Sequence, residues 1–352
     1  MWCAVAPATD EYVVSFPTLG FMVADWIEWH CIVPKGFKKG LPFTMSDWQL
    51  WCTVNHYRVK TDALWIPDDP VLAPAFHNRR SQVVAPQKTG KGPWSAGMML
   101  NEAAGPSVFC GWAKGGEQYL CSDYDCFCGF TYEYLPGEPM GMPRPDPEIQ
   151  LLAASEDQVR NVYGPLQAMV KGGPLAAIMR VGEEFTRVHM DGRIDAITSS
   201  ALSRLGNPIT AANMDETGTY TEVNKLKGVA RTMRRGLAGM GGRGIETTNA
   251  WDPGANSTAQ ETYESRAPDI FRFYRQPPTN LKFANKADRR KILRYVYAGS
   301  TWVNLDGIEA EALELMEKDP AEAERFFGNI LVQGKGAWMP QDLWKNTEQV
   351  AK

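Results

Sequence analysis

The sequence has no long apolar run and no large excess of either charge. In its 352 residues no apolar stretch approaches the roughly 18 residues of a membrane-spanning helix. Its first residues show neither the charged leader nor the apolar segment of a secretion signal. Lys and Arg number 37 against 41 Asp and Glu, a net charge of −4, which excludes a generally basic nucleic-acid coat. We therefore expect a soluble, non-secreted globular protein with one large domain or two smaller ones.

Cysteine and histidine give little support for a metal site. The cysteines number seven, and a chain of this length needs no disulfide staples, so free thiols in a reducing compartment are expected. Four of them lie in one short stretch: Cys110, Cys121, Cys126 and Cys128. These four could bind zinc, but they lack the paired C-x-x-C units of structural zinc sites, so plain thiols are the favoured interpretation. The histidines are scattered among unrelated segments: His30, His56, His77 and His189. This spacing disfavours a histidine-centred metal site or catalytic triad.

The chain divides into three parts, and no internal repeat is visible. Residues 1–78 are rich in Trp and Pro and contain two short helical patterns, at 23–29 and 46–51. From 81 to about 274, short apolar runs alternate with helical patterns, which is typical of an α/β domain with a mostly parallel sheet. The expected strands are 82–85, 107–111, 149–154, 186–189, 209–214 and 244–248. Beyond Pro277-Pro278 the pattern becomes helical, at 288–297, at 308–317 and again from Asp319-Pro320.

The sharpest local signal is a strand, loop and helix within residues 83–93. The loop contains Gly90-Lys91, and Pro93 stands in the first turn of the following helix, where proline is favoured. A phosphate-binding loop needs this context, because the backbone N–H groups face the phosphates and the lysine reaches the β- and γ-phosphates. Two positions depart from the usual pattern: Ala85 replaces its first glycine, and Gly92 replaces the Ser or Thr that holds Mg²⁺. A lysine-bearing surface turn is the alternative.

Two later strands end in polar residues suited to phosphate chemistry. Strand 209–214 is followed by Asp215-Glu216, and an Asp for Mg²⁺ with a Glu for the attacking water is what a phosphate-loop ATPase needs. Such a pair also occurs by chance. Strand 244–248 runs into Asn249 and on to Pro253, where hydroxyl and amide groups could sense a γ-phosphate or simply form a turn.

Basic residues are concentrated in two stretches. The first contains Lys225, Lys227, Arg231, Arg234, Arg235 and Arg243. The second contains Arg272, Arg275, Lys282, Lys286, Arg289, Arg290, Lys291 and Arg294. On an acidic protein they indicate two basic surfaces for a polyanion, or else solvated helix faces.

Four motifs, taken in order, resemble those of the large terminase subunit of tailed bacteriophages, closest to phages of actinobacterial hosts. They are Ala85-Pro86-Gln87-Lys88-Thr89-Gly90-Lys91-Gly92, Ala153-Ala154-Ser155-Glu156-Asp157-Gln158, Met214-Asp215-Glu216-Thr217 and Glu246-Thr247-Thr248-Asn249-Ala250-Trp251. The resemblance spans about residues 17–344, and the order of the motifs is far more specific than any one of them. It implies an α/β phosphate-loop NTPase fold of the ASCE type, with a mostly parallel sheet flanked by helices and a small helical lid.

The resemblance also assigns roles to residues. Lys91 and Glu216 would be catalytic, as phosphate clamp and catalytic carboxylate, and Asp215 would hold Mg²⁺. ATP would be bound by Gln49, for the adenine, and by the loop residues Pro86, Gln87, Lys88, Thr89, Gly90, Lys91 and Gly92. Coupling of hydrolysis to DNA movement would use Thr247, Thr248 and Asn249. A neighbouring subunit's arginine finger could be Arg231, Arg234 or Arg235. Gln87 stands where many relatives carry an arginine in the loop, and Gly92 cannot ligate Mg²⁺.

The implied function is an ATP-driven motor that pumps double-stranded viral DNA into a procapsid. The implied partners are the portal protein, the small terminase subunit and further copies in a homo-oligomeric ring in the host cytoplasm, with no membrane. The expected domains are residues 1–78 and 276–352, which form a lid, and an ATPase core at 79–275. Relatives continue into a nuclease after the segment that corresponds to residues 336–340, so no nuclease activity is expected here. The alternatives are a nucleotide-dependent DNA-binding or scaffold module with weakened catalysis, and a superfamily 2 helicase.

Overall fold

A mostly parallel sheet of eight strands organises the part of the chain that the structure, a computed structural model, describes: residues 12–67, 74–189, 191–197 and 208–334. Expectations for the first eleven residues and for residues 336–340 lie outside these ranges. In sheet order the strands are β12 (Ile270–Tyr274), β1 (Arg80–Val84), β11 (Arg243–Thr248), β10 (Ala211–Asp215), β6 (Glu148–Leu152), β9 (Arg193–Ile197), β8 (Phe185–Val188) and β7 (Met179–Val181). Neighbours from β12 to β9 run parallel, and β9, β8 and β7 pair antiparallel. Strands β1, β10 and β11 are buried along their whole length, as expected of parallel strands with both faces covered.

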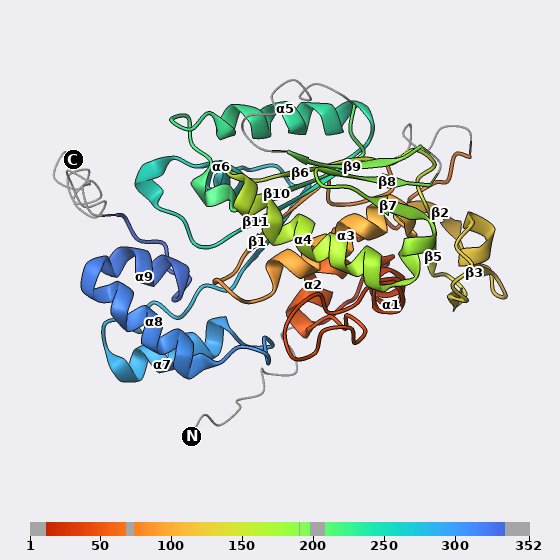
Figure 1. Cartoon of the computed structure of the whole chain (residues 1–352). Coiled ribbons are helices and arrows are strands. Elements are labelled where there is room, and N and C mark those ends of the chain that lie inside the picture. The colour runs from red at the N-terminus through yellow and green to blue at the C-terminus, as the bar shows by residue number, and fades with distance from the viewer. Residues whose placement is uncertain (1–11, 68–73, 190, 198–207, 335–352) are drawn as a thin grey trace.

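Helices cover both faces of this sheet (Figure 1). They are α1 (Gly20–His30), α2 (Asp47–His56), α3 (Lys91–Ala104), α4 (Glu156–Gly172), α5 (Leu226–Gly239), α6 (Thr258–Glu264), α7 (Lys286–Val296), α8 (Leu305–Lys318) and α9 (Pro320–Phe326). Helices α3 and α4 pack on one face with α1 and α2 beneath them, and α5 and α6 cover the other. Among the described residues, no helix combines the length and the apolar character needed to cross a bilayer.

The hydrophobic core is divided by the sheet. One cluster joins α1 to α4 with the sheet and includes Trp26, Trp48 and Trp94. A second lies under α5, and a third is formed by α7, α8 and α9 with the turns beside them. The last three helices are therefore a separately packed unit, at the lower left of Figure 1. The described part of residues 1–78 shares its core with α3 instead, and the predicted lid built from both ends of the chain stays a prediction.

The sequence located the strands that carry the motifs and missed others. The expected strands at 82–85, 149–154, 209–214 and 244–248 correspond to β1, β6, β10 and β11, with small shifts of their ends. The expected strand at 107–111 is wrong as part of the main sheet. It forms β2 (Val108–Trp112), which pairs only with β5 (Pro139–Met142) in a small separate sheet. Between them, β3 (Gln118–Leu120) and β4 (Thr131–Glu133) form a second small hairpin.

Candidate active site

The predicted catalytic segments meet at one edge of the sheet. In the parallel register Val84 lies opposite Thr248, and Asp215 lies opposite Thr247. The residues that follow β1, β10 and β11 therefore emerge side by side, because parallel strands present their carboxyl ends at the same edge. The loop at 85–90, the pair Asp215-Glu216 and the segment from Asn249 form one site.

Lys91 is buried at the start of α3, after the left-handed Gly90. Its Nζ donates hydrogen bonds to the carbonyl oxygens of Ala85 at 2.6 Å and Pro86 at 2.9 Å. A third bond, of 2.9 Å, runs to Oδ1 of Asn249. Burial lowers the pKa of Lys91, and the charges of Glu216 and Asp215 oppose this shift. The ammonium group is thus held by the loop and by the neighbouring strand, at the helix N-terminus where anions are favoured.

The two acidic side chains stand directly beside this lysine. Asp215 is buried, and one of its carboxylate oxygens accepts a hydrogen bond of 2.6 Å from the hydroxyl of Thr247. Burial raises the pKa of both Asp215 and Glu216, while Lys91 acts in the opposite direction on each. Glu216 has a φ of 57°, a left-handed conformation that is uncommon for glutamate. A carboxylate with a raised pKa is suited to accept a proton from water.

Asn249 connects the lysine to the catalytic acid. Its Oδ1 accepts from Lys91, and its Nδ2 donates to Oε2 of Glu216 at 3.1 Å. The preceding residue, Thr248, accepts a hydrogen bond of 3.0 Å from the N–H of Gly218, just after Glu216. The predicted coupling residues Thr247, Thr248 and Asn249 therefore contact both acids or the backbone beside them. A change of charge at Lys91 or Glu216 would therefore alter the hydrogen bonds of Asn249 directly.

The helices of the C-terminal unit lie on the phosphate loop. The indole of Trp302 donates to the carbonyl of Lys88 at 3.2 Å, and the hydroxyl of Ser300 donates to that of Thr89 at 3.3 Å. The N–H of Gln87 donates to the carbonyl of Phe326 at 3.1 Å. These contacts were not predicted from the sequence, because they join the loop to residues more than 200 positions later in the chain.

Gln49 lies against the same loop, but its amide is already bonded. Its Nε2 donates to the carbonyl of Gly90 at 3.3 Å, and its Oε1 accepts from the N–H of Ser46 in a capping box at the start of α2. Ser155, in the second motif, also caps its helix, by accepting from the N–H of Gln158. The predicted role of Gln49 in binding adenine stays a prediction.

Helix packing accounts for the glycine at position 92. A Cβ atom there would lie 2.3 Å from the carbonyl oxygen of Asn161 on α4. No side chain fits at that distance, so α4 excludes the usual Ser or Thr from this loop. The metal ligand that the chain itself offers at this point is Asp215, and Mg²⁺ is commonly bound by one carboxylate together with phosphates and water. The residues present therefore fit Mg²⁺ bound together with a nucleotide.

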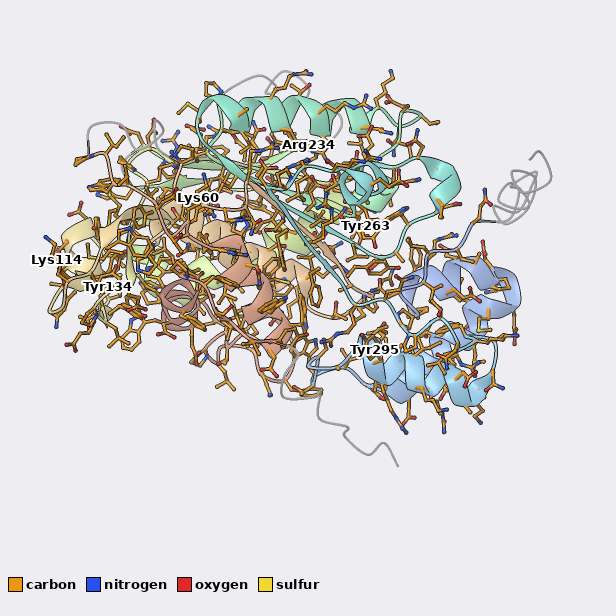
Figure 2. The ribbon with its side chains drawn as sticks, turned by 180° about the vertical axis from the view of Figure 1, so that it is seen from behind. Lys60, Lys114, Tyr134, Arg234, Tyr263 and Tyr295 are labelled. Atoms are coloured by element: carbon orange, nitrogen blue, oxygen red, sulfur yellow. The ribbon has the colours of Figure 1, made fainter. Side chains whose placement is uncertain are left out.

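The three candidate arginine fingers differ in the exposure and bonding of their side chains. Arg234 is part of α5 (Figure 2), and its side chain donates at 2.7 Å to Glu246 on β11, a fully buried carboxylate that also pairs with Arg80. Arg231 is exposed and paired with Glu222 and Glu261, and Arg235 is exposed. Arg234 is therefore bonded within its own chain, and the role of any of the three arginines as a finger stays a prediction.

The expectation of two basic surfaces needs correction, because several cations of each stretch are buried inside the protein. In the first stretch Lys227, Arg234 and Arg243 are largely or fully buried and bonded to Glu261, Glu246 and Glu102, respectively. In the second stretch Arg275 is buried, and so is Arg289, which pairs with Glu309. Sequence patterning cannot separate these internal cations from solvated ones. The cations that stay exposed around α7 are Lys282, Lys286 and Lys291.

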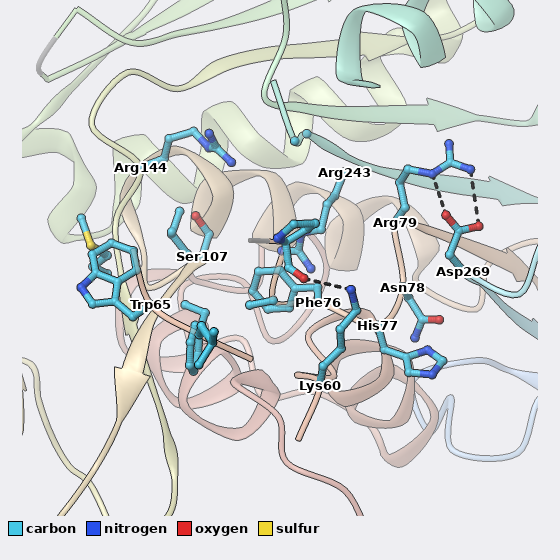
Figure 3. A pocket seen from close by; sticks show the side chains of 18 of the residues that line it. Lys60, Trp65, Phe76, His77, Asn78, Arg79, Ser107, Arg144, Arg243 and Asp269 are labelled. Carbon is cyan, nitrogen blue, oxygen red and sulfur yellow. Dashed lines mark hydrogen bonds and ion pairs between the residues drawn. The ribbon is translucent and has the colours of Figure 1, made fainter. Parts of the chain in front are cut away.

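A separate pocket of about 840 Å³ lies at the opposite edge of the sheet. It is lined by residues that precede β1, β11 and β12, among them Asn78, Gly242 and Pro268 (Figure 3). Several of its charged groups are bonded within the chain. Arg79 pairs with Asp269 at 2.8 Å, and Lys60 donates to the carbonyl of Pro74 at 3.0 Å. This pocket is therefore distinct from the site around Lys91.

The sequence is similar to those of proteins from two mycobacteriophages. No protein-family profile matches the sequence. The chain is similar to the Gene 13 protein of Mycobacterium phage L5, with 24% identity over 290 residues, and to that of Mycobacterium phage D29, with 27% over 286. These alignments cover 74% and 72% of this chain but 45% and 44% of the relatives. The chain therefore spans about half the length of the curated relatives that it matches.

The structure is similar to the crystal structure of the HK97 bacteriophage large terminase. The TM-score is 0.61 at 17% identity, and the match covers 93% of this chain and 58% of the other. At this identity the likeness concerns the fold. The mycobacteriophage relatives agree with the predicted resemblance to phages of actinobacterial hosts. The chain thus has the phosphate-loop α/β fold of a bacteriophage large terminase, and the resemblance predicted from its four motifs is confirmed.

Proposed function

We propose that this chain is the ATP-hydrolysing motor part of a viral DNA-packaging terminase. The observation that carries the proposal is Asn249, whose side chain bonds both the loop lysine Lys91 and the acid Glu216. A structural lysine in a surface turn has no need of such a link. A site that responds to the γ-phosphate does need such a link, because one amide then contacts both the lysine that binds the phosphate and the catalytic carboxylate.

In this function Lys91 and the backbone of residues 86–92 bind the phosphates, Asp215 holds Mg²⁺, and Glu216 orients and deprotonates the attacking water. Bound Mg²⁺ supplies positive charge that offsets the charge developing on the phosphates. The loop carbonyls that now accept from Lys91 release it to the nucleotide. The ammonium needs no large movement for this, since it already stands at the N-terminus of α3.

Coupling to movement follows two routes from the site. One runs from Glu216 through Asn249 along the segment after β11. The other runs from the loop into the C-terminal helices, through Trp302 on Lys88 and Phe326 on Gln87. A nucleotide that changes the loop therefore shifts α7 to α9 as a unit, because these helices have their own hydrophobic core.

The partners follow from the same proposal. Several copies form a ring on the portal protein, with Arg231 or Arg235 of one copy completing the ATP site of the next. The small terminase subunit supplies the DNA, in the host cytoplasm. DNA contacts fall on exposed cations such as Lys282, Lys286 and Lys291, because a translocating motor grips phosphates without reading bases.

The test is steady-state ATP hydrolysis by the wild type and by Asn249→Ala. Loss of the amide should lower kcat by about 10²-fold, the usual effect of removing one preorganised hydrogen-bond donor from an active site. ATP binding should persist, because Lys91 is retained. Asn280→Ala, in an exposed turn before α7, is the matched control and should hydrolyse at the wild-type rate. Equal rates for Asn249→Ala and the wild type would contradict the proposal.

A second function is favoured by one observation, the absence of a hydroxyl at Gly92. In a module with weakened catalysis, nucleotide binding alone would control DNA or scaffold contacts. This alternative expects ATP binding by the wild type with no turnover, even in the presence of double-stranded DNA, portal and small subunit. Hydrolysis that rises with these partners, and packaging of DNA into procapsids, supports the motor.

A further inference from the structure

Three of the four clustered cysteines meet a histidine that lies far from them in the sequence. Cys121, Cys126 and Cys128 follow β3, in the turn before β4, and His30 is the last residue of α1. Their three Sγ atoms and a ring nitrogen of His30 all lie within 4.8 Å of one another. All but Cys128, which is partly exposed, are buried. Cys110, the fourth cysteine of the stretch, is not in this group.

The distances fit a tetrahedron around a zinc ion. Nε2 of His30 lies 3.1 Å from Sγ of Cys128, 3.5 Å from that of Cys121 and 3.8 Å from that of Cys126. Zn–S and Zn–N bonds of about 2.3 and 2.0–2.1 Å at tetrahedral angles place S and N about 3.5 Å apart. The three separations are scattered around this value. A zinc ion would thus need only small movements of the side chains.

The surroundings orient the ligands as in a structural metal site. Nδ1 of His30 lies 2.7 Å from the carbonyl oxygen of Trp26, so this nitrogen carries the proton and Nε2 presents its lone pair to the sulfurs. The N–H of Phe130 donates to Sγ of Cys128 at 3.4 Å, across Gly129 with its left-handed φ of 83°. Trp26 also stacks on the imidazole with ring centroids 4.1 Å apart. The histidine therefore has one orientation and one tautomer.

The position of the group explains why the fold needs a ligand there. The segment between β2 and β5 contains two strands of three residues each, β3 and β4. Tyr119, Phe130 and Tyr134 of this segment are buried in the main core, but the segment has little regular structure of its own, and small units of this kind are commonly held together by a metal. The group joins this segment to α1, which packs in the main core. A closed link at this point would fix the hairpin to the body of the ATPase.

We propose that His30, Cys121, Cys126 and Cys128 bind one structural Zn²⁺ ion. Thiolates with one imidazole are the ligands that select zinc among the common divalent ions. All four coordination positions are filled by the protein, so the ion has no open position for catalysis. From the sequence, zinc was disfavoured because the cysteines lack a paired C-x-x-C unit. The fourth ligand, His30, was not recognised, since it lies 91 residues before Cys121.

The test is the metal content of the full chain, purified under reducing conditions from cells grown with zinc. Elemental analysis for zinc, iron, nickel and copper should find about one zinc per chain, as for a closed site with four ligands. Cys121→Ser and Cys126→Ser should lose most of it. Cys110→Ser is the matched control, from the same stretch but outside the group, and should keep the full zinc content.

A second measurement covers ligand variants that fail to fold. Wild-type protein depleted of metal and given Co²⁺ should show the strong visible bands of tetrahedral cobalt with thiolate ligands, and so should Cys110→Ser. Two results would overturn the proposal. One is wild-type protein without zinc that also gives no tetrahedral cobalt spectrum. The other is a peptide map of freshly purified, unreduced protein that shows a disulfide between two of the three cysteines.

Discussion

Replacing Gly92 by serine would restore the hydroxyl that phosphate loops normally carry, and we expect it to damage the protein instead. The added Cβ would lie 2.3 Å from the carbonyl oxygen of Asn161 and 3.3 Å from the carbonyl carbon. Both atoms belong to the backbone of α4, which cannot rotate away like a side chain. The helices α3 and α4 would have to separate by several tenths of an ångström.

The substitution should lower the free energy of unfolding. Overpacking of a closely packed interior destabilises proteins by about 1–3 kcal/mol, and backbone contacts lie at the upper end of that range. Each kcal/mol lowers Tm by roughly 2 °C in a chain of this size, so Gly92→Ser should melt several degrees below the wild type. ATP hydrolysis should fall too, because the displaced N-terminus of α3 carries Lys91.

Gly228→Ser on α5 is the matched control. A Cβ at this helical glycine meets nothing within 4 Å, so the same substitution should be neutral or slightly stabilising, by up to about 0.5 kcal/mol. Thermal unfolding and ATP turnover of both variants give the comparison. A Gly92→Ser protein as stable as the wild type and with faster hydrolysis would refute the packing argument.

Three further predictions concern the charged groups. Arg234→Ala should lower the free energy of unfolding by about 3 kcal/mol in urea denaturation, because the buried Glu246 then keeps only its more distant partner Arg80. The control Arg235→Ala should change this free energy by less than about 0.5 kcal/mol. Equal effects of the two substitutions would contradict the buried ion pair. Burial lowers the pKa of His56 to about 4, below its ordinary 6.5, so the unfolded chain binds more protons between these values. Stability should therefore be complete above pH 6.5 and fall by up to about 3 kcal/mol as the pH drops to 4, with a smaller loss in His56→Gln. Replacing three exposed lysines by alanine should weaken the affinity for duplex DNA and reduce the slope of log affinity against log salt concentration by up to about three units. The control triple variant should keep the wild-type slope. Equal slopes in the two variants would exclude these cations from the DNA contact. The test variant changes Lys282, Lys286 and Lys291, and the control changes Lys35, Lys38 and Lys39.

The sequence predicted the parts of the site that local patterns encode. A β-branched run into Gly90-Lys91 marks a strand and a helix start, and Asp215 and Asn249 each lie at the end of a strand that the sequence predicted. Parallel pairing then brings the three strand ends together, so the geometry of the site followed from the strand assignments. The order of the four motifs then predicted the phosphate-loop fold.

The parts that escaped prediction depend on contacts between distant segments. Whether Arg234 faces solvent or Glu246 depends on how α5 packs on β11, which no charge pattern records. The last strand, β12, follows α6 closely and was not among the expected strands. His30 joins the cysteines only because α1 packs beside the β3–β4 hairpin. The contact of Trp302 with the loop likewise depends on the position of the C-terminal helices.

In the proposed mechanism, Lys91 and Glu216 perform separate steps at one ATP site. The most direct measurement combines binding of a fluorescent ATP analogue with steady-state hydrolysis in Lys91→Ala and Glu216→Gln. Lys114→Ala and Glu222→Gln, both on exposed side chains, are the controls. Lys91→Ala should lose affinity for the nucleotide, whereas Glu216→Gln should bind it and turn over at least 10²-fold more slowly, a rough value for loss of the catalytic base. Hydrolysis by Glu216→Gln at the wild-type rate, or undiminished binding by Lys91→Ala, would contradict the account.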